Sequence, residues 1–271
     1  MIERPKEKVR CSVISFVSYS LTPWPASLPM LHIFNKEINS YLNSLIAYVV
    51  IAVFLTGVGL LMWLFPDTSV LDYGFAELST LFSLGPYVFM FLIPAITMRS
   101  FAEEKKAGTM ELLLTQPVTD LALIIGKFLA AWVVVLFALV PTLIYYFSVY
   151  QLGNPVGNVD SAGIFGSYIG LLLLGGVFTS IGIFASSLTE NQVIALILAV
   201  FLCFFLYTGF SSIAGLGVWG KSAYLVNQLG ILYHYDAMSR GLIDSRNLVY
   251  FLTVVVLMLL LTQLVLNSRK W

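Results

Sequence analysis

Six apolar segments, each about as long as a bilayer is thick, constrain the fold of this chain more than any other feature. A helix needs about 20 mostly apolar residues to cross the hydrocarbon core of a membrane. Hydrophobic residues make up 59% of the 271 residues and charged residues only 10%, whereas soluble domains carry about 25% charged residues. The sequence therefore predicts an all-α polytopic membrane protein with six transmembrane helices, over residues 42–65, 81–98, 121–147, 163–187, 191–211 and 248–266.

A charged stretch, residues 99–120, separates the second and third apolar segments. A charged side chain at the centre of a bilayer costs about 3 kcal/mol, so we expect this stretch to lie in water. Gly108 should end a first polar helix, and Pro117 should end a short second helix over residues 110–116. That second helix has three large apolar residues on one face, Met110, Leu113 and Leu114. These residues alone fit a helix on the membrane surface as well as a docking helix for a soluble protein.

Lysine and arginine are unevenly distributed between the two predicted sides of the membrane. Eleven of the 14 lie before the first span, within residues 99–127 or in the C-terminal tail, and the opposite side carries Lys221, Arg240 and Arg246. Because cytoplasmic loops are enriched in Lys and Arg, we expect both termini and residues 99–120 to be cytoplasmic. We also expect Lys127 to lie close enough to the end of its span to reach water.

The N-terminal region divides at residue 30. Residues 1–29 contain four prolines and no spanning pattern. We expect them to form a tail outside the main domain, with Met30 as an alternative natural start. Residues 30–41 have apolar side chains at helical spacing, which predicts an amphipathic helix in the membrane interface. The alternative is a simple polar flank of the first span. The interfacial helix would have an apolar face and a polar face, with Phe34 and Ile38 on the first and Lys36 and Glu37 on the second.

Small residues recur along the fourth apolar segment, at Ala162, Gly166 and Gly170 and more loosely at Gly175, Gly176 and Gly182. Small residues allow transmembrane helices to approach each other closely. This face could therefore pack against another part of the same chain or against a second protomer.

The stretch between the last two spans, residues 207–247, has apolar pieces that are too short to cross a membrane. We expect re-entrant helices there, in a region that includes Gly215, Gly217, Gly220, Tyr235 and Gly241. Residues 215–222 also match G-x-x-x-x-G-K-[ST], the pattern of a phosphate-binding loop. Such a loop joins a strand to a helix in a soluble α/β domain, whereas this one follows a predicted span. We interpret it as the turn between two short helices.

Residues typical of catalysis are scarce. The two histidines, His32 and His234, should lie on opposite sides of the membrane, and no spacing of His, Cys, Asp or Glu is typical of a metal site. We therefore expect no catalytic centre, metal or cofactor in this chain. Charges are also nearly absent from the apolar segments, which argues against a proton- or ion-coupled transporter.

Several segments resemble one family of membrane proteins. FAEEKK (101–106) followed by GTMELLLTQPVTD (108–120) is similar to the signature of ABC-2-type permeases, whose first cytoplasmic loop reads roughly E-x-x-x-GT-x-E-x-LL-x-x-P. NKEINSYLNSLIAYV (35–49) resembles the opening helix and first span of this family. ASSLTENQVIA (185–195) and YDAMSRGLIDSRNLVYF (235–251) are similar in particular to the gliding-motility permease GldF and its relatives.

The resemblance covers residues 30–271 and implies a single six-span permease domain in a bacterial inner membrane. It implies that cytoplasmic ABC ATPase subunits bind ATP and Mg²⁺ and press on a coupling helix in this chain. The implied partners are these ATPases, a second permease copy or paralogue, membrane lipids and a GldG-like auxiliary membrane protein, with no nucleic acid. The implied role is export or gliding motility, without catalysis by this chain, and the alternative is a non-transporting scaffold that transmits ATPase work to envelope machinery. The coupling helix would comprise Gly108, Thr109, Met110, Glu111, Leu112, Leu113, Leu114 and Pro117.

Overall fold

The computed structural model describes residues 29–66, 68–71, 77–110, 119–216 and 222–268. These residues fold almost entirely into helices, and no strand occurs among them. Within the described ranges, five helices are long and apolar enough to cross a membrane. A sixth crossing results if the bent pair at the N-terminal end counts as one span. The prediction of an all-α polytopic membrane protein is therefore confirmed.

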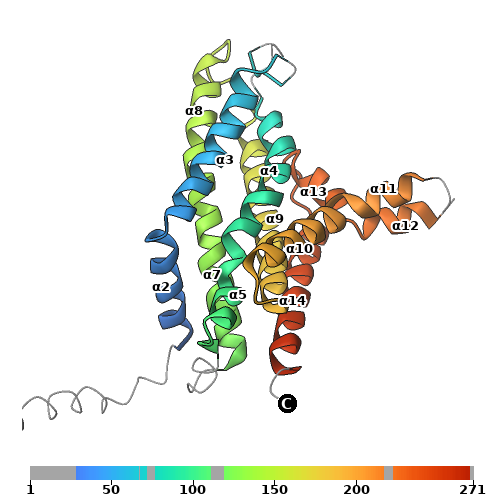
Figure 1. The fold of residues 1–271 in the computed structure, drawn as a ribbon. Coiled ribbons are helices and arrows are strands. Elements are labelled where there is room, and N and C mark those ends of the chain that lie inside the picture. Colours follow the sequence, from blue (N-terminus) through green and yellow to red (C-terminus); the bar gives the residue numbers. More distant parts are fainter. Residues whose placement is uncertain (1–28, 67, 72–76, 111–118, 217–221, 269–271) are drawn as a thin grey trace, which may run out of the picture.

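The first half of the chain supplies three crossings (Figure 1). The bent pair consists of α2 and α3, whose axes differ by 65°. Helices α4 and α5 together form one 28-residue helix, and a 3₁₀ turn, η1, joins α7 to α8 in a 33-residue helix. The bounds are α2 (Pro29–Leu42), α3 (Leu45–Trp63), α4 (Ser79–Thr97), α5 (Arg99–Lys106), α7 (Asp120–Leu139), η1 (Val140–Thr142) and α8 (Leu143–Leu152).

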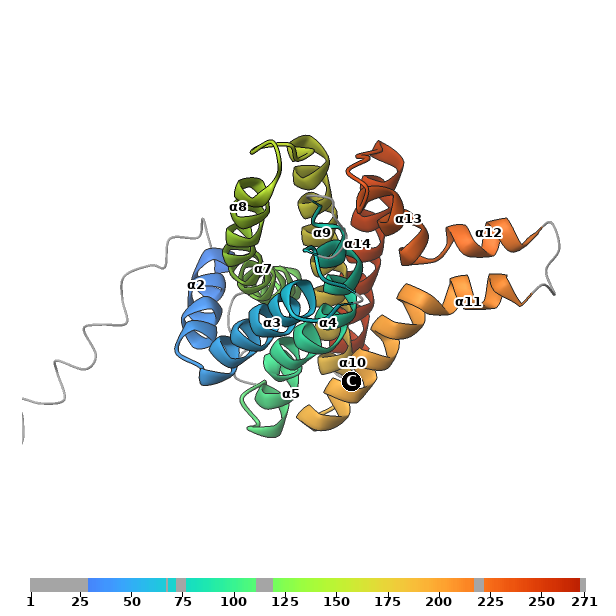
Figure 2. The ribbon, with the colours of Figure 1, turned by 90° about the horizontal axis from the view of Figure 1, so that it is seen from above.

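The second half contains the remaining crossings and a side arm. One π-helical turn, η2, connects α10 to α11, and α11 and α12 project sideways from the bundle next to each other (Figures 1 and 2). The bounds are α9 (Ser161–Leu188), α10 (Gln192–Phe204), η2 (Phe205–Gly209), α11 (Phe210–Gly215), α12 (Ala223–Gln228), α13 (Ile231–Met238) and α14 (Ser245–Ser268).

The arm contains the sequence that matches a phosphate-binding loop. Gly215 ends α11, and Ser222 directly precedes α12. A helix therefore precedes this sequence, whereas a phosphate-binding loop follows a strand. Gly217 and Gly220 lie outside the described residues.

Helix α9 lies at the centre of the bundle and is the most buried of the five long helices. It packs against α4, α7, α10, α13 and α14. Its small residues allow this, because a Cβ added at Gly166 would lie 2.7 Å from the Gly241 carbonyl oxygen, and one at Gly170 would lie 2.9 Å from Met238 Cβ. The small-residue face thus packs within the chain, against the end of α13. Tyr235 also fixes α13, because its buried hydroxyl donates to the Phe82 carbonyl at 2.7 Å.

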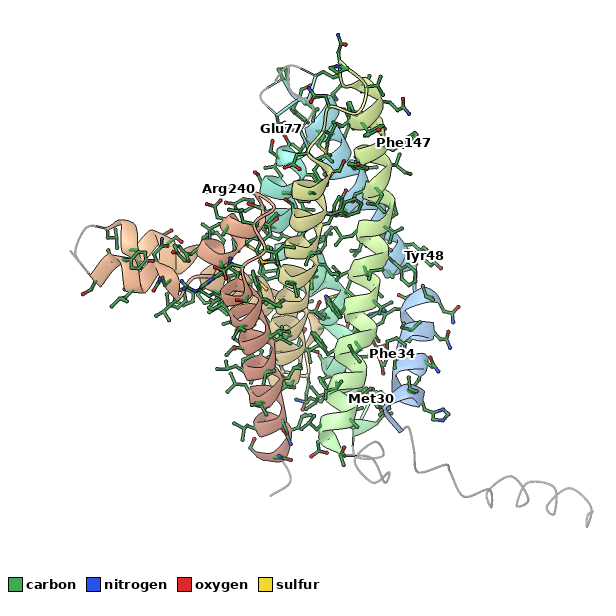
Figure 3. All side chains as sticks on the ribbon, turned by 180° about the vertical axis from the view of Figure 1, so that it is seen from behind. Met30, Phe34, Tyr48, Glu77, Phe147 and Arg240 are labelled. Carbon is green, nitrogen blue, oxygen red and sulfur yellow. The ribbon has the colours of Figure 1, made fainter. Side chains whose placement is uncertain are left out.

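The two ends of the bundle differ in what they contain. Met30 and Phe34 lie toward one end, and Glu77 and Phe147 lie toward the other (Figure 3). Helix α5 and the C-terminal end of α14 share the end that holds Met30 (Figure 1). The distribution of Lys and Arg assigns several segments to one side of the membrane. The described parts of these segments therefore lie at one end of the molecule.

Candidate functional site

The charged stretch between the second and third crossings is the site that the sequence singles out. Its described parts are residues 99–110, which contain α5, and residues 119–120, which begin α7. The remainder, 111–118, lies outside the described residues and includes Glu111, Leu112, Leu113, Leu114 and Pro117 of the predicted coupling helix.

Helix α5 ends in a glycine turn, as predicted. Gly108 has a φ of 68°, a left-handed conformation that glycine adopts without steric cost. The Thr109 N–H donates to the Glu104 carbonyl at 3.0 Å, and the Gly108 N–H donates to the Lys105 carbonyl at 3.1 Å. These two bonds form a Schellman motif, which satisfies the last carbonyls of the helix. The Thr109 hydroxyl also donates to the Glu104 carbonyl, at 3.2 Å.

On the other side of residues 111–118, α7 begins with a side-chain cap. The Thr119 hydroxyl oxygen accepts a hydrogen bond from the Ala122 N–H at 3.3 Å. Met110, the last described residue before 111–118, is half-buried. It packs against an apolar cluster at this end of the bundle, formed by Phe101, Leu123, Ile124, Phe128, Ile183 and Leu266. The first residue of the predicted docking face therefore contributes to the chain's own core.

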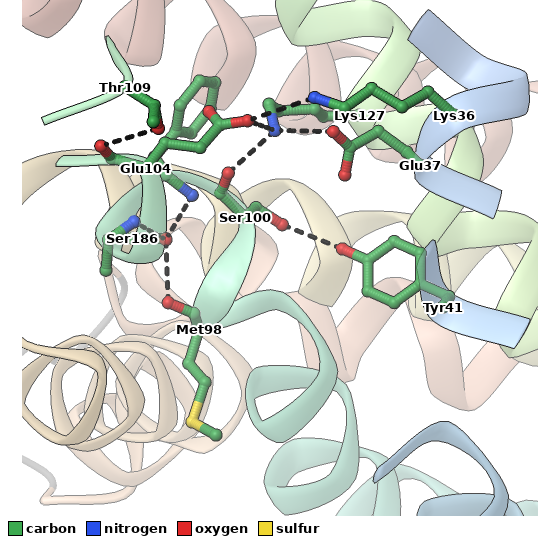
Figure 4. Close-up of polar contacts among 11 residues, drawn as sticks. Lys36, Glu37, Tyr41, Met98, Ser100, Glu104, Thr109, Lys127 and Ser186 are labelled. Atoms are coloured by element: carbon green, nitrogen blue, oxygen red, sulfur yellow. Dashed lines mark hydrogen bonds and ion pairs between the residues drawn. The ribbon is translucent and has the colours of Figure 1, made fainter. Parts of the chain in front are cut away.

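The beginning of α5 is held by α9. The backbone N–H groups of Phe101 and Ala102 donate to the Ser186 hydroxyl oxygen at 3.0 and 3.1 Å, and the Ser186 hydroxyl donates to the Met98 carbonyl at 2.9 Å (Figure 4). The Lys105 ammonium also donates to the Ser187 carbonyl. Ser186 thus fills the role of a helix cap from another element, at the junction between α4 and α5.

A buried ionic cluster lies beside this junction. Lys127 in α7 is only 1% exposed. Its Nζ donates to Glu37 Oε1 at 2.9 Å, to Glu104 Oε1 at 2.8 Å and to the Ser100 carbonyl at 2.9 Å (Figure 4). An ammonium group has three N–H donors, so each donor has an acceptor here. The prediction that Lys127 reaches water was wrong, because α2 and α5 cover α7 at this level.

The cluster also corrects two other expectations. Glu37 was predicted on the polar face of the N-terminal helix, but it is 9% exposed and points at Lys127. The apolar segments were expected to be almost free of buried charge, and Lys127 is an exception. No local sequence pattern predicts the ion pair of Glu37 with Lys127, because the two residues are 90 residues apart. Opposite charges in two predicted helices were the only available signal.

The rest of α2 agrees with the predicted amphipathic helix. Phe34 and Ile38 pack against an apolar cluster that α2 shares with α7, and Lys36 is exposed. Gly126 in α7 allows this close packing, because a Cβ added there would lie 2.9 Å from Ile33 Cγ2. Tyr41, one turn after Glu37, is buried, and its hydroxyl lies 2.9 Å from Ser100 Oγ. Helix α2 is thus attached to both α5 and α7.

A polar cleft of about 300 Å³ lies between α2, α5 and α7. The Arg99 guanidinium donates to Ser44 Oγ at 2.9 Å. Two buried atoms, Arg99 Nε and Glu104 Oε2, have no hydrogen-bond partner among the described residues. The lining of the cleft includes Lys36, Glu37, Arg99, Glu103, Glu104 and Thr109.

His234, the histidine in the second half of the chain, is held in place by neighbouring residues. The His234 ring nitrogens lie 2.8 Å from Asn247 Oδ1 and 2.9 Å from the Gln228 carbonyl oxygen, and the ring stacks on Tyr250. Asp236 pairs with Arg240. Within the described ranges, no group of three or more His, Cys, Asp or Glu residues is arranged to hold a metal ion.

Together, these features define a multi-pass membrane protein with a firmly anchored charged segment between two of its crossings. Residues 31–270 match the family described as ABC-2 family transporter protein, and the chain belongs to this family. The match extends over all the described helices from α2 to α14. No curated protein matches the chain. The resemblance to ABC-2-type permeases is thus confirmed, and the chain is a transmembrane component of a transporter.

Proposed function

We propose that this chain is the permease subunit of an ABC exporter and that residues 99–120 couple it to a cytoplasmic ATPase. The observation that carries the proposal is the attachment of both flanks of residues 111–118 to the bundle. On one flank, α5 is capped by Ser186 and closed by the Gly108 turn. On the other, α7 begins at the Thr119 cap and contains Lys127, which binds back to α5. Rigid elements with fixed contacts can transmit a displacement between distant sites.

The proposal places ATP hydrolysis in a separate protein. ATP and Mg²⁺ are bound by the partner ATPase, whose closure presses on residues 111–118. The distribution of Lys and Arg supports a cytoplasmic location for this end of the bundle. The permease pairs with a second copy or a paralogue in the bacterial inner membrane.

The biological setting that we propose follows from the resemblance to GldF in residues 185–195 and 235–251. The subunit then acts in gliding motility or in export at the cell envelope, with a GldG-like auxiliary membrane protein as a further partner. Purification of the complex from native membranes, with identification of its subunits, tests this setting directly.

The coupling role is tested by the double variant Leu113→Asp with Leu114→Asp. Two carboxylates on the predicted apolar face would have to be desolvated at an ATPase interface, and a charge buried without a partner costs several kcal/mol. We expect co-purification of the ATPase to fall at least 100-fold, while membrane insertion remains normal, since about 1.4 kcal/mol corresponds to a tenfold change in affinity.

The matched control is Thr115→Asp with Gln116→Asp, which adds the same charge to the same stretch but leaves the apolar side chains in place. This control should retain the ATPase. Undiminished co-purification with the Leu113 and Leu114 variant would show that the ATPase docks elsewhere.

A further inference from the structure

We propose that α2 belongs to the coupling apparatus: Lys127 joins it to α5 and α7 through Glu37 and Glu104, so that the three helices move as one unit. The inference rests on the proposed function, because α5 and α7 are the flanks of the coupling segment. It adds a partner for that segment within the same chain, far away in sequence.

The first argument is the geometry around Lys127. Of its three acceptors, one carboxylate comes from α2, and the other carboxylate and the carbonyl come from α5. Lys127 itself belongs to α7, so a single ammonium group joins three elements. A displacement of any one element would remove an acceptor from a buried charge, and an unpaired buried charge is strongly unfavourable. The three helices therefore have a common reason to keep their relative positions.

The second argument is that the charges balance within the cluster. Two carboxylates surround one ammonium group, and Lys36 of α2 brings a second cation to 4.0 Å from Glu104 Oε1. Lys36 is exposed, whereas Lys127 is not. The cluster thus needs no further charged group to be neutral, and α2 supplies half of its charges.

The third argument is that two more contacts join the N-terminal elements to α5. The Tyr41 hydroxyl lies 2.9 Å from Ser100 Oγ, and the Arg99 guanidinium donates to Ser44 Oγ at 2.9 Å. These contacts continue the line from Glu37 along α2 to the short connection before α3. Helix α2 and the connection that follows it are therefore both attached to α5.

The connection between α2 and α3 is bent by 65°. A movement of the α2, α5 and α7 unit would reach α3 through this bend, and α3 is a helix of the membrane bundle. We infer that the ATPase cycle changes the angle at this bend and leaves the distance between α2 and α5 unchanged.

The experiment measures distances between spin labels in the purified complex of permease and ATPase, with and without ATP and vanadate. One label pair, Asn39→Cys with Lys106→Cys, reports on α2 and α5. A second pair, Asn39→Cys with Tyr48→Cys, reports on the bend. The labelled positions are exposed, Cys11 is replaced by serine, and Cys203 is fully buried. We expect the first distance to stay constant on trapping and the second to change.

The role of the cluster is tested with Glu37→Leu, which releases α2 but leaves Lys127 paired with Glu104. In this variant we expect the distance between α2 and α5 to change or broaden on trapping. Glu37→Gln keeps an acceptor oxygen for Lys127 and should behave like the wild type. Asn35→Leu alters the exposed side of the same helix and is the matched control.

The outcomes separate this inference from the proposed function. If no ATPase co-purifies with the wild-type chain, the proposed function is wrong. If the ATPase co-purifies but the wild-type distance between α2 and α5 changes on trapping, or the bend does not move, the inference alone is wrong. A Glu37→Leu variant with wild-type distances would also overturn it. The wild-type measurements decide the matter even if that variant does not fold.

Discussion

At the scale of single residues, the junction of α4 and α5 depends on the absence of a side chain at Gly182 of α9. Thr97 is fully buried there and donates its hydroxyl to the Ile93 carbonyl at 2.9 Å. A Cβ added to Gly182 of α9 would overlap with Thr97 Oγ1 and would lie 2.9 Å from Thr97 Cβ. The absence of a side chain at residue 182 therefore allows α9 to lie directly against the junction, where Ser186 caps α5.

We predict that Gly182→Ala destabilises the fold by about 1–3 kcal/mol, the usual cost of an overpacked core. Thermal unfolding of the detergent-purified chain measures this loss. Gly57→Ala is the control, because a Cβ at Gly57 meets nothing within 4 Å. Alanine is a better helix former than glycine by about 1 kcal/mol, so the control should unfold at the same or a higher temperature. Equal unfolding temperatures for the two variants would contradict the prediction.

At the scale of elements, α5 shows which boundaries a sequence reveals. Its end was predictable, because Gly108 carries a local signal for the left-handed turn that closes a helix. Its beginning was not, because the group that caps it, Ser186, lies 84 and 85 residues further along the chain. The same contrast holds for α7, where Thr119 caps the first turn locally, while the partner of Lys127 in α2 is 90 residues away.

We predict that Ser186→Ala loosens α5, since two buried N–H groups lose their acceptor and each unsatisfied group costs about 1–3 kcal/mol. Hydrogen–deuterium exchange at Phe101 and Ala102 should accelerate, and the chain should unfold at a lower temperature. Ser187→Ala is a neighbouring control, because the Ser187 hydroxyl donates only to the Phe184 carbonyl of its own helix. Similar exchange rates in both variants would exclude a capping role for Ser186.

At the scale of the whole molecule, composition and apolar segments were sufficient to predict the fold class and the approximate positions of the crossings. They did not predict how the helices pack. The apolar pattern ended the second span at residue 98, and the polar helix predicted to end at Gly108 continues that span through α5 to Lys106. The charged helix α5 can continue the span because it has polar partners at the end of the bundle. Lys127 binds the Glu104 carboxylate, and the Ser186 hydroxyl oxygen accepts a hydrogen bond from the Ala102 N–H. Such pairings depend on topology, which the helical period of a single sequence does not encode.

The orientation of the molecule yields the last prediction. Helix α5 and the connection between α8 and α9 lie at opposite ends of the bundle (Figure 1). Lys106 is the last residue of α5, Asn158 belongs to that connection, and both are exposed. Eleven of the 14 basic residues belong to segments assigned to the end that contains Lys106, and positive charge is retained in the cytoplasm. In spheroplasts that carry Cys11→Ser, a membrane-impermeant maleimide should label Asn158→Cys directly. It should label Lys106→Cys only after permeabilisation, and the reverse pattern would invert the topology and remove the coupling segment from reach of a cytoplasmic ATPase.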